Sequence, residues 1–581
     1  FKNKMIKKIS VILSNKQKSR MTLLIFSSLP LILLETISIS SLPIYLITIL
    51  NPSKIFEYID YPDLENIILN MPFSERSLYG LVVIFFIFLI KAVYHFLFNY
   101  FELNTKKKIN LEHSNKVYSY YLNESYSFHT QNNPSKLIQN ISDVQRSTSV
   151  IFSIFSIFKE LILIFSIIGI LAFSEPIILI ITLAIFSLPI TFFLTYYKKT
   201  FKKRGEIAKK SRILILKNLQ ESFLLIKFIK MIGNQEHVKN NFELQNHRSL
   251  HQETIVAIIG RTPRIILELV TVLSISVIIL FLFQTGKSLE TMLPLLTLLV
   301  VSLVRFIPSV GVILVGINQY KFHHVSLSNI YNIFSLHDKD IKERELKNID
   351  KNDNQKIIFK KNIQLSGVDF SYPNTKKSSL KNVNFVINKN SKIGIKGPTG
   401  SGKSTLIALL LGFLKPNNGE IKVDNNNVHN NLISWQKSIG YVPQTIHLLD
   451  DTIKKNICFG IDDNRIDNAM LEKVIKISGI DEFIDNQPNK LDTIIGHDGA
   501  RISGGQLQRI GIARALYLDP KILILDEPTS SLDAITEENI IKKILSLAEL
   551  TVILISHNPE IIKKCDNVLI LKNQTVTSNK T

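Results

Sequence analysis

The sequence predicts a multidomain membrane protein, in which an all-α domain of six membrane-spanning helices is followed by an α/β P-loop domain. Apolar runs of about 20 residues or more, long enough to cross a bilayer as helices, occur within residues 21–316. From residue 357 onward, short apolar strands alternate with helical segments. A glycine-rich loop, Gly397–Ser404, follows one of these strands, which is the context of a phosphate-binding loop.

Six segments are apolar and long enough to span a membrane. They lie near residues 22–49, 79–102, 148–173, 176–197, 256–284 and 291–316. Only Ser174 and Glu175 separate the third span from the fourth, which predicts a tight hairpin, and a short loop near residues 285–290 joins the fifth to the sixth. We therefore predict a transmembrane domain over residues 1–320, a polar linker over 321–356 and an α/β domain over 357–581.

Long polar stretches with helical character separate the second span from the third and the fourth from the fifth. They are too long for simple loops, so we expect the helices to continue beyond the membrane and to reverse at turns near Phe128–Asn133 and Leu214–Phe228. On the other side, segment 54–71 has the apolar spacing of an amphipathic helix resting on the membrane, interrupted by Pro62. An ordinary loop is the alternative for that segment.

The formal net charge of +21 is concentrated in segments 2–20, 104–116 and 198–217, whereas the loop 51–78 is acidic. Basic loops stay on the cytoplasmic side, so this asymmetry predicts cytoplasmic N- and C-termini and accounts for the charge without a nucleic-acid partner. Cys458 and Cys565 are far apart and form no CxxC pair, so neither a disulfide framework nor a zinc site is predicted.

The loop Gly397–Ser404 fits the pattern G-x-x-x-x-G-K-S and lies between the apolar strand Lys392–Ile395 and the helix Thr405–Leu414. Glycines let backbone amides wrap the phosphates of ATP, and the helix N-terminus favours their negative charge. Lys403 is expected to reach the β- and γ-phosphates, and Ser404 is expected to bind Mg²⁺.

Three further residues follow buried strands in the same domain. The run Ile522–Leu525 ends at Asp526, whose carboxylate is expected to bind Mg²⁺ directly or through water. Glu527 is next, and hydrolysis requires a carboxylate there to polarise the attacking water. His557 follows the strand Thr551–Ile555 and is a candidate contact of the γ-phosphate.

These motifs, in this order, resemble the nucleotide-binding domain of the ATP-binding cassette (ABC) superfamily. The resemblance identifies Ile502–Gln506 as the signature loop, Asp533 as part of the D-loop, and Gln444 as the Q-loop glutamine that senses Mg²⁺ and the membrane domain. Tyr372 stands where the family stacks an aromatic ring on adenine, with an ordinary strand aromatic as the alternative. His497 replaces an acid that exporters use in domain coupling, a role that Asp498 would have to assume.

The resemblance and the motifs together define the expected site. The expected catalytic residues are Glu527, His557 and Gln444, and the expected Mg²⁺ ligands are Ser404, Gln444 and Asp526. The expected nucleotide-binding residues are Tyr372, Gly397, Pro398, Thr399, Gly400, Ser401, Gly402, Lys403, Ser404, Thr405, Ser503, Gly504, Gly505, Gln506 and Asp533.

Six spans followed by one such domain resemble the exporter class of the superfamily, with the two cytosolic turns as its coupling helices. The resemblance implies an ATP hydrolase coupled to transport, working as a homodimer, because ATP in this family lies between the P-loop of one domain and the signature of another. A heterodimer is the alternative. An ATP-gated protein that does not transport is a further class, but its usual sign, a degenerate Glu527 or signature, is not seen. A soluble ABC ATPase is disfavoured because such proteins lack six spans.

Charged residues inside the predicted spans raise the question of the cargo, because such groups normally face the bundle interior or a cavity. They pair with one another in one interpretation, for example Arg264 with Glu268. In the other, Lys91, Arg264 and Arg305 receive an anionic head group. The segments Pro263–Ile265 and Arg305–Ser309 and the outer stretch 54–71 resemble those of the bacterial lipid-linked oligosaccharide flippases, a branch of ABC exporters. This resemblance supports the second interpretation and implies a polyprenyl-pyrophosphate glycolipid substrate and a bacterial inner membrane. Peptide or toxin export and lipid or drug export are the alternatives.

Overall fold

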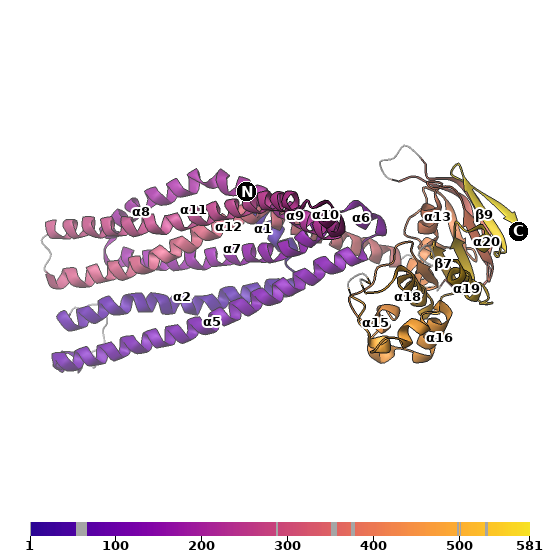
Figure 1. Ribbon diagram of the computed structural model, residues 1–581. Helices are drawn as coiled ribbons and strands as arrows, with labels where there is room; N and C mark the ends of the chain where they lie inside the picture. The colour runs from indigo at the N-terminus through magenta and orange to yellow at the C-terminus, as the bar shows by residue number, and fades with distance from the viewer. Residues whose placement is uncertain are drawn as a thin grey trace. The chain divides into compact units, whose positions relative to one another are not determined.

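The computed structural model describes residues 2–53, 67–285, 289–349, 357–372, 378–496, 499, 501–528 and 533–580. The chain divides into two compact units, one of residues 1–124 and 128–346 and the other of residues 125–127 and 347–581. The first is helical and the second is α/β (Figure 1). We call them the transmembrane unit and the P-loop unit.

The described residues from 2 to 349 are almost entirely helical. Their named helices are α1 (Lys2–Ile12), α2 (Asn15–Leu50), α5 (Phe73–Asn123), α6 (Tyr126–Gln131), α7 (Pro134–Ser174), α8 (Pro176–Tyr196), α9 (Lys198–Leu224), α10 (Ile226–Ile232), α11 (Gln235–Gln284) and α12 (Leu289–Ile349). By length and composition, α2, α5, α7, α8, α11 and part of α12 are apolar enough to cross a membrane. This confirms the predicted six spans and the tight joint between α7 and α8.

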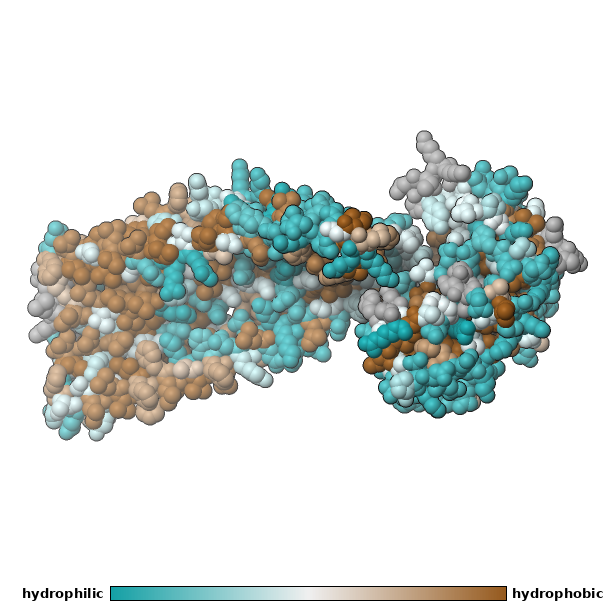
Figure 2. All heavy atoms as spheres, viewed as in Figure 1, coloured by the Kyte–Doolittle hydropathy of each residue, from teal (hydrophilic) through white to brown (hydrophobic). Residues whose placement is uncertain are grey.

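The long helices extend well beyond a bilayer. α5 has 51 residues, which at 1.5 Å per residue is about 75 Å, against about 30 Å of hydrocarbon. Figure 2 shows apolar side chains gathered over one end of the transmembrane unit and mostly hydrophilic side chains over the part that contains α9. The helices therefore carry polar extensions, as the sequence predicts.

The reversals of these extensions fall partly where they are expected. The short helix α6 overlaps the predicted turn Phe128–Asn133. The second prediction, Leu214–Phe228, contains the break at Leu225 between α9 and α10, but it begins too early, because α9 continues to Leu224 and α10 extends to Ile232. Residues 214–224 contain no glycine or proline, and the first glycine, Gly233, caps α10 in the left-handed conformation with φ 72°.

Two other predicted segments have particular outcomes. Residues 321–349 of the proposed linker are helical as the last part of α12. Residues 54–66 of the predicted outer segment 54–71 lie outside the described residues. His497, Asp498 and residues 529–532 of the D-loop region lie outside them as well.

The P-loop unit contains two sheets. The strands are β1 (Asn362–Phe370), β2 (Leu380–Asn388), β3 (Lys392–Lys396), β4 (Asn418–Val423), β5 (Asn426–Asn427), β6 (Ile439–Val442), β7 (Ile522–Asp526), β8 (Thr551–Ile555), β9 (Asn567–Lys572) and β10 (Thr575–Lys580). The antiparallel sheet has the order β2-β1-β4-β5, and the second sheet has the order β10-β9-β3-β8-β7-β6. All pairs in the second sheet are parallel except β10 with β9.

Helices accompany these sheets. They are α13 (Lys403–Leu410), α14 (Leu432–Lys437), α15 (Ile453–Ile457), α16 (Asn468–Ser478), α17 (Asp481–Asp485), α18 (Gly504–Tyr517), α19 (Ala534–Leu545) and α20 (Pro559–Ile562). The strands β7 and β8 are buried almost throughout, as expected for parallel strands that are covered on both faces. The fold therefore agrees with the predicted class, a six-helix transmembrane domain followed by an α/β P-loop domain.

The topology of the parallel strands positions the site. β3, β8, β7 and β6 are neighbours in that order, and parallel strands end at one edge of a sheet. Ligands of such sheets bind beyond the carboxyl ends of the strands. The P-loop follows β3, His557 follows β8, Asp526 ends β7 and is followed by Glu527, and Gln444 follows β6. Residues more than 100 positions apart in sequence thus meet at one edge.

Candidate ATP site and membrane hollow

The P-loop has the backbone conformation that only glycine adopts without strain. Gly400 and Gly402 have φ of 79° and 103°. A Cβ on Gly402 would lie 2.7 Å from the carbonyl oxygen of Ser379. Lys403 Nζ donates to the carbonyl oxygens of Gly397 at 2.7 Å and Pro398 at 3.2 Å, so its ammonium group lies over the loop that is to hold the phosphates.

Glu527 lies between two of the other predicted catalytic residues. Gln444 Nε2 donates to Glu527 Oε2 at 2.8 Å, and His557 Nε2 lies 2.9 Å from Glu527 Oε1. Glu527 also has a left-handed backbone, with φ 49°, which is uncommon for a residue with a Cβ. The structure therefore brings Gln444, Glu527 and His557 together as the sequence predicts.

Asp526 and Ser404 fit the needs of a magnesium ion. Burial raises the pKa of the Asp526 carboxyl and the neighbouring Glu527 carboxylate raises it further, whereas Lys403 lowers it. The described residues contain no cluster of three His, Cys, Asp or Glu side chains suited to a metal. Mg²⁺ is usually held by one or two carboxylates together with waters and substrate phosphates, so the Asp526 carboxylate and the exposed Ser404 hydroxyl are a suitable set.

A cavity of about 550 Å³ joins these residues. Its described lining includes Tyr372, Ser378, Ser379, Thr399, Gly400, Gly402, Lys403, Ser404, Thr405, Gln444, Glu527, His557 and Gln574. Tyr372 is 41% exposed, and its hydroxyl lies 3.3 Å from Thr405 Oγ1, so its ring is available for stacking on a base. Ser378, Ser379 and Gln574 were missed by sequence reasoning, because serines near a strand start and a glutamine in a turn form no recognisable motif.

The signature residues do not line this cavity. Ser503 caps α18, since its hydroxyl accepts from Gln506 N at 3.2 Å and Gln506 Oε1 accepts from Ser503 N at 2.8 Å. Asp533 caps α19 in the same way by accepting from Thr536 N at 2.9 Å. Neither these residues nor Gly504 and Gly505 are among the described lining of the P-loop cavity. The structure of one chain thus separates two groups that the sequence predicts to share one ATP.

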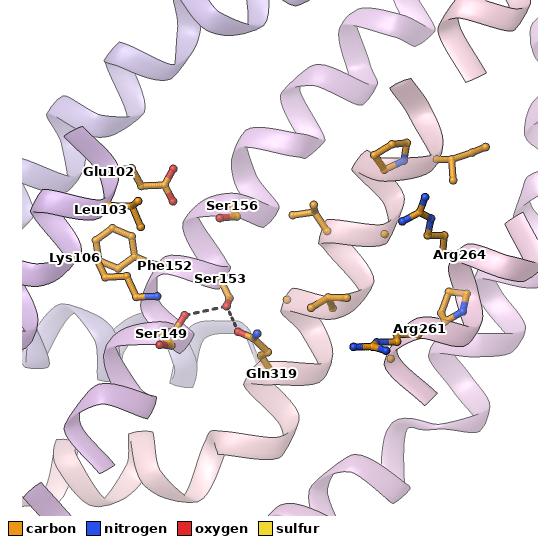
Figure 3. A pocket seen from close by; sticks show the side chains of 18 residues that line it. Glu102, Leu103, Lys106, Ser149, Phe152, Ser153, Ser156, Arg261, Arg264 and Gln319 are labelled. Carbon is orange, nitrogen blue, oxygen red and sulfur yellow. Dashed lines mark hydrogen bonds between the residues drawn. The ribbon is translucent and has the colours of Figure 1, made fainter. Parts of the chain in front are cut away.

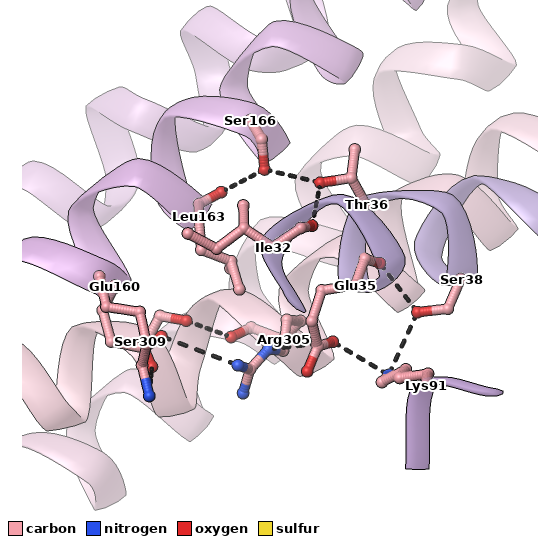
Figure 4. A network of polar contacts seen from close by, with 11 residues as sticks. Ile32, Glu35, Thr36, Ser38, Lys91, Glu160, Leu163, Ser166, Arg305 and Ser309 are labelled. Carbon is pink, nitrogen blue, oxygen red and sulfur yellow. Dashed lines mark hydrogen bonds and ion pairs between the residues drawn. The ribbon is translucent and has the colours of Figure 1, made fainter. Parts of the chain in front are cut away.

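Two of the three predicted substrate residues belong to a buried ionic network (Figure 4). Glu35, only 3% exposed, pairs with Lys91 Nζ at 2.9 Å and with Arg305 Nε at 3.4 Å. Arg305 Nη2 also lies 3.8 Å from Glu160, which has Lys159 at 3.9 Å. The network connects α2, α5, α7 and α12, and it corresponds to the interpretation in which charges within the spans pair with one another.

The third residue, Arg264, lies in a different place. It lines a hollow of about 640 Å³ between α5, α7, α11 and α12, and Figure 3 shows Arg261 and Arg264 on one side of this hollow with Glu102 and Lys106 on the other. Arg264 Nε donates to Glu268 at 3.0 Å, yet the arginine side chain is 78% exposed. Arg261 and Lys106 were missed, although the i, i+3 spacing of Arg261 and Arg264 places them on one helix face.

Comparison with known proteins agrees with this division of the chain. Residues 24–302 match the family model of the ABC transporter transmembrane region, and residues 380–530 match that of the ABC transporter. The structure of a bacterial Atm1-family ABC exporter with ATP bound superposes with a TM-score of 0.76, covering 96% of this chain and 95% of that chain at 19% identity. At this identity the likeness shows the fold.

Two curated relatives add sequence similarity. The ATP-dependent lipid A-core flippase of Coxiella burnetii is 30% identical over 354 residues, which are 61% of this chain and 58% of that protein. A multidrug resistance ABC transporter ATP-binding and permease protein of Lactococcus lactis is 35% identical over 221 residues, 38% of this chain and 37% of that protein. The matches thus span less than two thirds of these relatives.

The chain belongs to the ABC transporter superfamily. It is of the exporter type, with a six-helix transmembrane domain followed by an ATP-binding domain in one chain. The predicted superfamily and fold are confirmed, and the predicted ATP hydrolase agrees with this membership at the level of the family.

Proposed function

We propose that the chain hydrolyses ATP to export an amphipathic substrate across the bacterial inner membrane from the cytosolic side. The observation that carries the proposal is the position of Glu527, which contacts Gln444 at 2.8 Å and His557 at 2.9 Å beside the P-loop. The usual sign of a protein in which ATP only gates a pore is a degenerate Glu527 or signature, and this chain has both Glu527 and Ser503–Gln506. The basic segments beside α1 and α9 support cytoplasmic termini.

Each residue of the site has a part in hydrolysis. The P-loop amides and Lys403 bind the phosphates and neutralise their charge. Ser404, Asp526 and Gln444 are suited to hold Mg²⁺, which supplies further neutralisation of the charge on the phosphates when bound. Glu527 orients the attacking water and accepts its proton, and His557 contacts the γ-phosphate.

Two copies of the chain are needed to complete one ATP site. Ser503 and the glycines after it begin α18, where backbone amides and the helix dipole favour an anion, but they do not line the P-loop cavity of their own chain. A homodimer supplies the signature of a second copy to each P-loop. Cross-linking tests this: Ser503→Cys and Thr399→Cys are combined with Glu527→Gln, and a disulfide between two copies is expected in the presence of ATP. Disulfides formed only within one copy would contradict the dimer.

The proposed cargo is a lipid-linked oligosaccharide or a related glycolipid. Arg264 and Arg261 lie at a hollow whose lining also includes Phe152, Ile307 and Val312, an environment for a molecule with an anionic head and an apolar body. The similarity to a lipid A-core flippase favours a glycolipid. The similarity to a multidrug resistance transporter favours drug export as the second candidate.

The deciding experiment is ATP hydrolysis by the purified protein in liposomes. Polyprenyl-pyrophosphate glycans, lipid A core and an apolar cationic drug are compared as stimulants. Stimulation by a glycolipid that Arg264→Ala abolishes, with basal hydrolysis unchanged, supports the proposal. Stimulation by the drug alone moves the second candidate to the front, and a wild-type protein without hydrolysis contradicts the proposed function. Arg305→Ala is assayed separately, because its network partners make it a structural residue as well.

A further inference from the structure

A second hollow adjoins the one that contains Arg264, and its lining is strongly basic. It has a volume of about 490 Å³. Arg146 of α7, Arg212 of α9 and Arg261 of α11 line it, and Glu253 is the one acidic side chain in the described lining. Three positive charges against one negative charge leave an excess of two positive charges, with His323 counted as neutral. Three helices distant in sequence thus direct like charges to one place.

Two of these arginines are held in position by buried or partly buried carboxylates. Asp143, which has no exposed surface, contacts Lys209 Nζ at 2.7 Å and Arg146 Nη1 at 3.2 Å. Arg212 Nη1 donates to Glu253 Oε1 at 2.8 Å. Arg261 is exposed and makes no hydrogen bond or ion pair with the described part of the chain. The hollow therefore combines two pre-positioned guanidinium groups with one that is free to turn toward a ligand.

Buried polar atoms in the same lining have no partner within the described chain. Asn318 is 4% exposed, and its Nδ2 has no acceptor. Arg212 Nε and His323 Nδ1 are also buried without a partner. An unpaired buried polar group costs about 1–3 kcal/mol. The amide and guanidinium donors, which line the hollow together with the positive charges, are suited to a ligand that offers several acceptor oxygens and negative charge.

The basic hollow continues into the apolar one. The two share Gly260, Arg261, Val315 and Gln319. The further lining of the apolar hollow includes Phe152, Ile307, Pro308 and Val312, which fall within the predicted spans. Arg146, Glu253 and Asn318 lie just outside the predicted spans, near the polar extensions. Toward the polar extensions the lining therefore gains cationic side chains, which suits a lipid whose head group follows its acyl chains.

We propose that the two hollows together form a binding site for a lipid phosphate. The phosphate is held by Arg146, Arg212 and Arg261 through charge-assisted hydrogen bonds, with Asn318 Nδ2 as a further donor. The apolar part of the lipid lies against the lining that includes Ile307 and Val312. This inference deepens the proposed function and rests on it for the transport step, but the binding itself needs no ATP. The site is separate from the Glu35–Lys91–Arg305 network.

Native mass spectrometry of the full-length protein in detergent, without nucleotide, tests the binding. The probes are phosphatidic acid and phosphatidylcholine with the same acyl chains. We expect phosphatidic acid to bind more tightly, and Arg261→Glu to weaken its binding about tenfold or more. Arg248→Glu on the exposed part of α11 is the matched control and should leave the affinity unchanged. Because Arg261 has no partner in the described chain, its variant should retain the unfolding midpoint of the wild type.

A second variant distinguishes a lipid from a soluble anion. Val312→Gln changes the apolar hollow at a side chain that is 39% exposed, and it should weaken phosphatidic acid binding without affecting inorganic pyrophosphate. If pyrophosphate displaces the lipid and Val312→Gln has no effect, the ligand is a soluble phosphate and the lipid assignment is overturned. Equal losses in Arg261→Glu and Arg248→Glu, or equal binding of both lipids, overturn the site itself. Basal ATP hydrolysis, measured in parallel, reports on the proposed function alone.

Discussion

The P-loop unit and the transmembrane unit use charged residues in opposite ways. In the P-loop unit, Lys403 and Glu527 lie at a cavity edge, where glycines and strand ends leave room for a ligand. In the transmembrane unit, Lys91 and Arg305 are paired with buried Glu35, while Arg261 and Arg264 face a hollow. A charged residue of the P-loop unit therefore has a role that its motif already indicates. A charged residue of the transmembrane unit is either a structural partner or a ligand contact.

The difference arises from the partners that each environment permits. At a strand end, the P-loop backbone dictates the position of Lys403 whatever the distant sequence. Inside a bundle of long helices, a charge must find a partner across helices, because an unpaired charge in lipid is costly. Which helices meet is a tertiary property. Four substitutions examine this comparison, from the largest expected effect to the smallest.

Glu527→Gln should strongly slow ATP hydrolysis by the P-loop unit without unfolding it. Removal of the carboxylate that orients and deprotonates water is expected to slow hydrolysis by about 10²–10⁴-fold, with ATP binding retained. Phosphate release and binding of a fluorescent ATP analogue measure the two quantities. Glu560→Gln, an exposed glutamate of α20 paired with Lys563, is the control. Hydrolysis near the wild-type rate would show that another group serves as the base.

Glu35→Gln should destabilise the transmembrane unit, because Lys91 and Arg305 both lose a buried partner. Breaking a buried ion pair from one side costs about 3–5 kcal/mol. The thermal unfolding midpoint in detergent should fall clearly below that of Glu221→Gln, which removes an exposed pair on α9. An unchanged midpoint would mean that the network contributes nothing to the fold and that Lys91 and Arg305 are available to substrate.

Asp526→Asn should stabilise the nucleotide-free protein while it removes a magnesium ligand. The pKa of Asp526 is raised in the folded protein, so its charged form is disfavoured there relative to the unfolded chain. The gain in the free energy of unfolding should be complete at pH values above the raised pKa of the folded state. It should vanish as the pH falls below the pKa of the unfolded state, about 3.9. Unfolding midpoints across pH, with exposed Asp462→Asn as the control, measure this. A loss of stability at neutral pH would contradict it.

Arg264→Ala should have the smallest effect on stability. Its pair with Glu268 is one helical turn long and largely exposed, so its loss is expected to cost no more than about 0.5 kcal/mol. The unfolding midpoint should match that of the wild type within error. A large drop would group Arg264 with Lys91 and Arg305 as a structural residue and would contradict its role as a substrate contact.

Much of the P-loop unit was predictable from the sequence, because each motif carries its own local structure. Gly402 needs a positive φ, Lys403 begins a helix, and Asp526 ends a buried strand, and all three relations hold within a few residues of the chain. The meeting of Gln444, Glu527 and His557 was predictable for a further reason, since parallel strands end at one edge. The lining residues Ser379 and Gln574 were not, because their proximity depends on how separate turns pack.

The sequence by itself determined the number and order of the spans and the P-loop class of the second unit, and it predicted the motif residues of the ATP site. Apolar spans and motifs are formed by residues that are neighbours in sequence, and so they can be recognised from the sequence alone. Only the tertiary structure decided that Arg305 belongs with Glu35, that Arg261 joins Arg146 and Arg212, and that the second reversal lies at α10. These outcomes depend on which faces of long helices meet, and no single helix contains that information.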